Sequence, residues 1–425
     1  MLILYAGLLL SLLLLFWACA YRRWWLLFFV VFSSVFLNCS IGCSVLGIPL
    51  TAQKLGVSLA LLPLIPAVSM LGIPWKRMKT RLSLPFGLFI IIAAVSASQA
   101  SFLQAGLVSI ASLVLVFLLI HMVHLLLAMA DPFKVKRALS LSPLLFLAFD
   151  GVAIFQYVTH NHPYLRVPGT MGNPNAMAAM LLMALPLMLT VLEQTRGARR
   201  ILGAVSVFSS ISVILLTFSR VVLVFLPFFL MLYALVGLSK RKVSRNLVCA
   251  VVSVILIAAA MGAVMPSDIL GYFVQRAGGL ISGGINVYDP SIRVRLDAAA
   301  AAWECFRAKP LLGIGLDNFR LPAFFGHSTE NTYLQVLTGT GLLGFIAFSL
   351  VGLALWRSLW TGRTLKDNFL RALNRNLSLG FVVFLLLMFA NDYLTSAHVW
   401  IWVAIAVTLP VLDRRLAMAK GEGCG

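Results

Sequence analysis

The residues best suited to act on a substrate lie in one short stretch, GHSTENTYLQVLTGTGLLG, at Gly326–Gly344. His327 and Glu330 are three residues apart, so they share one side of any helix that begins this early. Either side chain can accept a proton from a hydroxyl group, which is a poor nucleophile at neutral pH without a base. The stretch therefore offers Glu330 and His327 as alternative bases, with Asn331 beside them as a candidate for contacting or shaping the site.

Arginines are candidates for binding an anionic substrate group, because the guanidinium stays charged and matches phosphate oxygens with two parallel donors. Arg220 lies between two apolar runs with almost no loop around it, in LLTFSRVVLVF. Arg293 and Arg295 point in different directions from one predicted helix. Since Arg293 can pair with Asp297 four residues on, Arg295 is preferred as the substrate ligand. Several such groups around one cavity could hold a diphosphate.

A third candidate region is RVPGTMGNPNAMAAMLL, residues 166–182. Asn173 can cap a helix and Pro174 suits its first turn, so the free N–H groups of that helix could face an anion. An ordinary helix cap explains the same pattern. Arg166 is a further diphosphate candidate, and Arg276 is a candidate for shaping the site.

Metal and cofactor chemistry are not indicated. The acidic residues Asp289, Asp297 and Asp317 are too dispersed for a metal cage to follow from their spacing. The 6 cysteines lie mostly inside apolar runs and form no CxxC pair. We therefore expect neither a bound metal nor a cofactor.

The elements that position these residues must lie in a membrane. Of the 425 residues, 61% are hydrophobic and only 11% are charged, which leaves too little polar surface for a soluble protein. Apolar runs long enough to cross a bilayer predict an all-α polytopic membrane protein with about 12 or 13 transmembrane helices. The runs are 2–20, 25–48, 56–74, 83–100, 103–128, 139–158, 174–193, 200–217, 220–238, 246–265, 333–356, 377–393 and 396–412.

The net charge of +20 reflects topology and not a nucleic-acid partner. If successive segments alternate in direction, most of the 33 basic residues fall on one side, as expected for cytoplasmic loops. The five arginines singled out above fall on the opposite, outer side. The basic clusters are 22–23, 76–81, 134–137, 196–200, 240–245, 357–375 and 414–415.

Three parts follow from this topology: transmembrane helices in 1–265, an outer loop subdomain in 266–332, and C-terminal transmembrane helices with a tail in 333–425. The loop is long enough to fold by itself. Its segment between Pro290 and Pro310 is rich in alanine, with Ser291 as a cap, and predicts a helix over about 292–308.

Four ordered motifs resemble the O-antigen ligase and polymerase superfamily. They are GTMGNPNAMAAMLLMALPL, LLTFSR, RLDAAAAAWECFRAKPLLGIGLDNF and ENTYLQVLTGTGLLG, and they span roughly residues 160–350. The resemblance implies a GT-C-like, metal-independent, inverting glycosyltransferase of the bacterial inner membrane. Its donor would be an undecaprenyl-diphosphate-linked glycan, and its active site would face the periplasm among membrane lipids.

The resemblance also assigns roles. The arginine of the SR turn and an arginine of the large loop contact the diphosphate in the family, which points to Arg220 and to Arg295 or Arg293. The ligase pattern is a His followed by Asn, Ser or Gln, then nine residues and GxxG, but here Glu330 holds the His position. Either Glu330 replaces that residue, or His327 reaches the same place from the preceding turn.

Three functions are compatible with these features. A ligase would transfer the glycan to a lipid A-core sugar, whereas a polymerase would transfer it to another lipid-linked repeat. A transporter of lipid-linked oligosaccharides would also be polytopic and bind a diphosphate. Transporters commonly contain internal repeats and ionisable groups near mid-bilayer, while the polar residues here gather on one side, which favours the enzyme.

Overall fold

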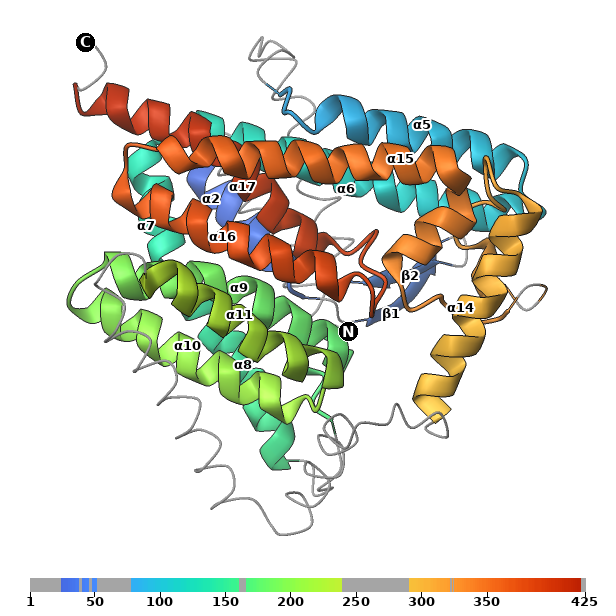
Figure 1. Ribbon diagram of the computed structural model, residues 1–425. Coiled ribbons are helices and arrows are strands. Elements are labelled where there is room, and N and C mark those ends of the chain that lie inside the picture. Colours follow the sequence, from blue (N-terminus) through green and yellow to red (C-terminus); the bar gives the residue numbers. More distant parts are fainter. Residues whose placement is uncertain are drawn as a thin grey trace.

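The computed structural model of the chain describes residues 24–37, 40–45, 48–51, 78–159, 166–238, 290–321, 323 and 325–421. Within these residues the fold is almost entirely helical, as predicted (Figure 1). Six helices are long and apolar enough to cross a membrane by length and composition. They cover Leu103–Met129, Pro132–Thr159, Pro174–Gln194, Ala198–Leu216, Thr332–Thr364 and Asn368–Leu387.

The elements follow one another along the chain with short connections. The first half contains α2 (Trp24–Ser34), β1 (Ser40–Val45), β2 (Ile48–Thr51), α5 (Ser83–Ser98), α6 (Leu103–Met129), α7 (Pro132–Leu141), α8 (Pro143–Thr159), η2 (Gly169–Met171), α9 (Pro174–Gln194), α10 (Ala198–Leu216) and α11 (Arg220–Leu238). The second half contains α14 (Pro290–Ala308), η3 (Asn318–Arg320), α15 (Thr332–Thr361), η4 (Gly362–Thr364), α16 (Asn368–Leu387) and α17 (Ala397–Ala419).

Most predicted runs that fall on described residues match a helix to within a turn, and two do not. The run 25–48 is helical only to Ser34 and then forms the antiparallel pair β1–β2. Gly42, Gly47 and Pro49 in this stretch are poor helix formers, which accounts for the early end. The run 377–393 is also shifted, because α16 begins at Asn368. The runs 2–20, 56–74 and 246–265 lie outside the described residues.

The start of α16 shows why its boundary was predicted too late. The carboxylate of Asp367 accepts hydrogen bonds from Phe369 N and Leu370 N at 3.0 and 3.1 Å and caps the helix. One face of the first turns is buried, including Phe369, Leu370 and Leu373. The helix therefore extends beyond the apolar run, and its polar residues emerge beside the basic loops.

The long helices pack against one another in a layered bundle (Figure 1). Helix α10 packs on α9 and α8, α16 packs on α9 and α11, α15 packs on α5, and α17 packs on α6. The helices leave two opposite ends. We call the end with the α6–α7, α9–α10 and α15–α16 connections the basic end, and the opposite end, with the α5–α6, α10–α11 and α16–α17 connections, the site end.

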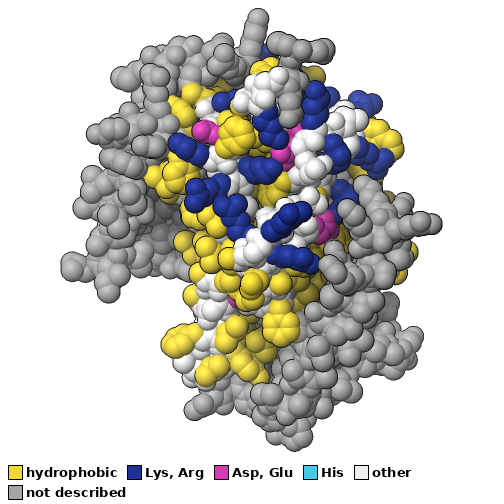
Figure 2. Space-filling model, turned by 90° about the vertical axis from the view of Figure 1, so that its left-hand side faces the viewer, with side chains coloured by type: hydrophobic (Ala, Val, Ile, Leu, Met, Phe, Trp, Pro, Cys, Tyr) yellow, Lys and Arg dark blue, Asp and Glu magenta, His cyan; other side chains and the backbone are white. Residues whose placement is uncertain are grey.

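The basic end carries the predicted gathering of lysines and arginines. Figure 2 faces this end and shows Lys and Arg side chains spread over it, with few acidic ones between them. Lys136 Nζ lies 2.7 Å from an Asp367 carboxylate oxygen, which joins α7 to the start of α16. Arg415 of α17 donates to the carbonyl oxygens of Ala128 and Ala130 at 2.5 Å. Basic loops distant in sequence thus share one end, as the charge pattern predicted.

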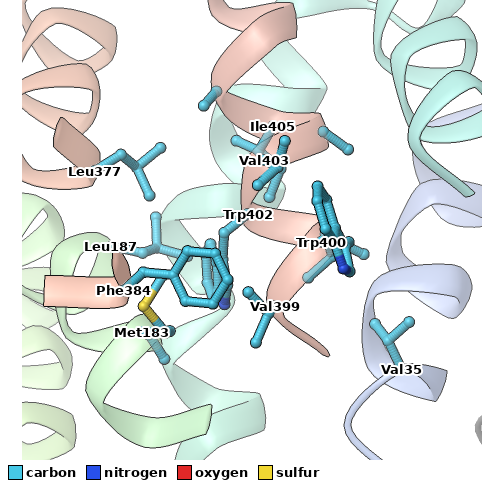
Figure 3. Close-up of a cluster of buried hydrophobic side chains, with 14 of the residues drawn as sticks. Val35, Met183, Leu187, Leu377, Phe384, Val399, Trp400, Trp402, Val403 and Ile405 are labelled. Carbon is cyan, nitrogen blue, oxygen red and sulfur yellow. The ribbon is translucent and has the colours of Figure 1, made fainter. Parts of the chain in front are cut away.

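Helix α17 lies inside the bundle and forms much of its core. Trp402 is 2% exposed and packs near Phe384 of α16 and Met183 of α9, while Trp400 lies on the side facing α2 (Figure 3). Lipid tails are as apolar as these side chains, so the cluster stabilises the bundle through close packing and not through removal of water. This core holds the ends of α9, α16 and α17 in fixed relation at the site end.

A sharp kink divides α15 at Gly341, whose φ of 64° is far from helical. The kink leaves backbone groups of α15 without helical partners, and the segment 310–316 supplies them. Ile314 N and Gly315 N donate to Thr338 O and Gly339 O at 2.9 and 3.0 Å, and Leu342 N donates to Pro310 O at 2.8 Å. The glycine spacing in TGTGLLG therefore serves a close approach between two backbones.

We expect Gly341→Ala to destabilise the protein. A Cβ at this position would collide with the backbone of Leu311 and Leu312, and its positive φ alone costs an L residue about 1–3 kcal/mol. The melting temperature of the purified protein in detergent should therefore fall. The control is Gly352→Ala in the same helix, where a Cβ meets no atom within 4 Å. Equal melting temperatures for the two variants would contradict the packing described here.

Candidate active site

The loop helix α14 brings an arginine to the start of α15. Arg295 Nη2 lies 3.5 Å from a carboxylate oxygen of Glu330, and the two side chains are 32% and 39% exposed. The other oxygen of Glu330 accepts a hydrogen bond from Ser328 Oγ at 2.9 Å. Glu330 itself has a φ of 50°, an uncommon conformation for a residue other than glycine. The carboxylate is thus held in place but remains open to solvent.

The first turn of α15 is tied to the α16–α17 loop. Asn331 caps the helix by accepting from Leu334 N at 3.1 Å. Thr332 Oγ1 donates to Asn391 O at 2.8 Å and accepts from Tyr393 N at 3.0 Å. His327 is exposed and its ring lies edge-on to Phe325, with 6.1 Å between the ring centroids. Of the two candidate bases, Glu330 is therefore the one fixed in a network.

A second charged group surrounds Arg320, at the end of η3. Arg320 Nε lies 3.0 Å from a carboxylate oxygen of Asp317, and its Nη2 contacts Asp392 of the α16–α17 loop. Asp317 also accepts from Gln335 Nε2 at 3.1 Å and from Ser109 Oγ at 2.5 Å. This group joins the outer loop to α6, to α15 and to the α16–α17 loop.

Burial and charge shift the pKa values in this second group. Burial raises the pKa of Asp392 to about 6, although the neighbouring Arg320 opposes the shift. Burial alone would lower the pKa of Arg320, but the carboxylates of Asp317, Asp392 and Glu330 together outweigh it and raise that pKa. Since Glu330 acts on Arg320 electrostatically, both charged groups belong to one site.

The stability of the protein is expected to depend on Asp392 between about pH 4 and pH 6. The unfolded chain releases this proton near 3.8 and the folded protein near 6, so the folded state binds more protons in this range. The free energy of unfolding contributed by Asp392 therefore falls as the pH rises through this range. In Asp392→Asn this fall should be absent when melting temperature is followed against pH. The exposed Asp297→Asn is the control, and identical pH profiles for Asp392→Asn and the wild type would refute the assignment.

A third group of polar residues lies at the same end of the bundle. Arg166 Nε donates to Thr217 O at 3.0 Å, and its Nη2 donates to Asn175 Oδ1 at 2.5 Å. Asn173 caps α9 by accepting from Asn175 N at 2.8 Å, as predicted. Helix α10 ends at Leu216 and α11 begins at Arg220, so the predicted tight turn is present. Arg220 is half-buried in the first turn of α11.

The structure arranges the predicted site residues as follows. Arg295 meets Glu330, and the α9 cap brings Arg166 close to the α10–α11 turn that leads into Arg220. Arg293 is 73% exposed and pairs with Asp297 at 4.0 Å, the partner predicted for it. Arg276 lies outside the described residues. Figure 1 shows the starts of α9, α11 and α15 and the body of α14 toward the same side of the molecule.

Sequence reasoning did not single out Arg320. The signal was available, because Arg320 belongs to the same outer loop as Arg295 and follows Asp317 by three residues. The argument that basic residues on the outer face need a separate explanation applies equally to it. Its link to Asp392 crosses 72 positions in the sequence, which no local pattern indicates.

Among the described residues, no group of three or more His, Cys, Asp or Glu side chains is placed to hold a metal ion. Charge at this end is carried by arginines and carboxylates. Such a set can bind an anion and accept a proton.

A helical membrane bundle with an arginine–carboxylate site in an outer loop defines a polytopic membrane protein built to handle an anionic substrate. Residues 204–349 match the family model described as O-antigen ligase. The chain belongs to the O-antigen ligase and polymerase superfamily, in agreement with the resemblance of its motifs. The matched region contains Arg220, Arg295, Arg320 and Glu330. No curated protein matches the chain.

At the level of this superfamily, the activity is of the glycosyltransferase kind, and the partners are lipid-linked glycans and membrane lipids. The six apolar helices and the family together describe a multi-pass membrane protein.

Proposed function

We propose that the protein is an O-antigen ligase of the bacterial inner membrane. It transfers a glycan from undecaprenyl diphosphate to a hydroxyl group of a lipid A-core sugar on the periplasmic face. The ion pair between Arg295 and Glu330 carries the proposal, because it sets a diphosphate ligand beside a proton acceptor within the region matched by the family.

The reaction follows from the charges of these groups. The acceptor hydroxyl attacks the sugar carbon and gives its proton to Glu330, while the bond between that carbon and the diphosphate oxygen breaks with inversion. Negative charge grows on the leaving diphosphate as this bond breaks. Arg220 and Arg295 stabilise that charge without a metal ion, since arginine offers paired donors to phosphate oxygens.

The resting ion pair also has a role in this scheme. Without donor, Arg295 and Ser328 hold the carboxylate of Glu330. A diphosphate competes with Glu330 for the guanidinium, because both are anions. Donor binding therefore releases the carboxylate to accept the proton of the acceptor hydroxyl, so the base becomes available only when a donor is present.

Replacing Arg295 with Ala should reduce glycan transfer at least tenfold, roughly the loss of one charge-assisted hydrogen bond in a transition state. Arg293→Ala provides the matched control, because Arg293 lies two residues away on α14, exposed and paired with Asp297. The measurement is transfer of labelled glycan by reconstituted protein. Equal losses in the two variants would remove Arg295 from the donor site.

A polymerase of the same superfamily is the second candidate, favoured by Glu330 at the position where the ligase pattern has His. One experiment separates the functions. Purified protein receives a labelled undecaprenyl-diphosphate glycan, with lipid A-core or without a second acceptor. Attachment to lipid A-core supports the ligase, and elongation of the donor alone supports the polymerase. Absence of any transfer, with donor movement across the membrane instead, would support a transporter and refute both.

A further inference from the structure

A pocket at the basic end lies outside the candidate active site. Its volume is about 490 Å³, within the usual range of ligand pockets. It is enclosed by α7, by the α9–α10 connection and by the first turn of α16. Helix α9 begins beside the candidate active site and ends at this pocket, so the two lie at opposite ends of one membrane-spanning helix.

The lining of the pocket is strongly basic. Lys136 and Arg137 come from α7, Arg196 precedes α10 and Arg199 lies in its first turn. The lining contains no acidic side chain. Lys136 is neutralised by Asp367 at 2.7 Å. Within the described part of the chain, no ion pair is formed by the remaining three, Arg137, Arg196 and Arg199. Three guanidinium groups therefore face one cavity without a protein counter-charge from these residues.

Neutral hydrogen-bond donors complete the lining. Ser140 and Thr195 add hydroxyl groups, and Ala198 and Arg199 are the first residues of α10. Gly197 precedes the helix and has no side chain to cap it. Arg200 N makes the first bond of this turn, to Gly197 O at 3.0 Å. Backbone N–H groups before that position point toward the end of the helix, where they favour an anion.

Excess positive charge at this end is expected from membrane topology alone, but a concave arrangement is not. Lys134 and Arg200 are neighbours of Lys136 and Arg199 in the sequence and are exposed without lining the pocket. The chain thus carries two kinds of basic residue at one end, those spread over its surface (Figure 2) and those converging on a cavity.

We propose that this pocket binds the phosphate group of an anionic ligand, and that the ligand is an acidic phospholipid of the adjoining leaflet. Arginine matches phosphate oxygens with paired donors, and basic pockets between transmembrane helices suit acidic headgroups. Phe133, 48% exposed, lines the same pocket and offers an apolar contact for the lipid. A bound lipid would link α7, α10 and α16 at this end.

The test compares two triple variants with the same loss of charge. The pocket variant carries Arg137→Gln, Arg196→Gln and Arg199→Gln. The control carries Lys134→Gln, Arg200→Gln and Arg414→Gln, which replace exposed basic residues of the same end outside the pocket. The full-length protein is purified in detergent, mixed with phosphatidylglycerol and phosphatidylcholine, and examined by native mass spectrometry for retained lipid.

We expect the wild type and the control to retain phosphatidylglycerol in preference to phosphatidylcholine. The pocket variant should bind phosphatidylglycerol at least about tenfold more weakly, because several charge-assisted contacts are lost together. Equal retention by both triple variants, or an equal loss in both, would overturn the proposal. The single variant Arg196→Gln provides a second measure if the triple variant folds poorly, which circular dichroism would reveal.

A second arm identifies the source of the phosphate. Soluble glycerol 3-phosphate is added as a competitor to the same lipid mixture. If it displaces the lipid only at high excess, the ligand is the phospholipid. If it binds as tightly as the lipid and with the same dependence on Arg137, Arg196 and Arg199, the phosphate site stands and its ligand is soluble. Lipid binding that persists in the pocket variant would refute the site in either form.

Discussion

Arg220→Ala is expected to lower glycan transfer by about 10²–10³-fold, the usual cost of removing a group that stabilises developing charge. Arg220 is half-buried at the start of α11, directly after the tight turn from α10. The guanidinium there is held by the backbone of a helix and not by a mobile loop. It can therefore meet the leaving diphosphate in a fixed geometry.

Two comparisons make the result for Arg220 specific. Arg220→Lys keeps the charge but loses the paired donors, so its transfer rate should lie between those of the wild type and Arg220→Ala. Arg414→Ala removes an exposed arginine at the basic end and should leave transfer unchanged. The melting temperature of each variant distinguishes loss of a substrate contact from loss of the fold. Normal turnover by a folded Arg220→Ala protein would exclude Arg220 from the diphosphate site.

Glu330→Gln should reduce transfer by about 10²–10⁴-fold, the usual contribution of a general base. The amide keeps the shape of the side chain and can still accept from Ser328, but it cannot take a proton. His327→Ala should have little effect, because His327 is exposed and contacts the Phe325 ring. The rate of transfer to lipid A-core at saturating donor is the quantity to compare.

The control for Glu330 is Glu304→Gln, an exposed carboxylate on α14 that pairs with Arg307. If His327→Ala is slow and Glu330→Gln is normal, the base is the histidine, as in the ligase pattern of the family. If both variants transfer normally, the proton acceptor lies elsewhere, and Asp317 and Asp392 beside Arg320 are then the carboxylates to replace.

Local patterns predicted the helices well where the sequence contains its own boundaries. Asn173 with Pro174 marked the start of α9, and the short SR turn marked the start of α11 at Arg220. The alanine-rich segment after Pro290 was correctly predicted as a helix, α14. In these cases a cap, a proline or a break in hydrophobicity lies within a few residues of the boundary.

Other features depend on partners distant in the sequence and could not be predicted in this way. The kink of α15 at Gly341 is stabilised by segment 310–316, and periodicity alone suggested one straight helix. The contact of Arg320 with Asp392 likewise requires the α16–α17 loop to fold back on η3. The candidate site was therefore located by residue type, whereas its connections required the structure.

The bonding of segment 310–316 to the kinked helix sets an order for biogenesis. The segment is synthesised before α15, so its backbone partners at Thr338, Gly339 and Leu342 do not yet exist when it emerges. The outer loop can dock only after α15 has inserted into the bilayer. Arg295 and Glu330 thus come together late in maturation, and a chain truncated before α15 would carry the arginine without a competent centre.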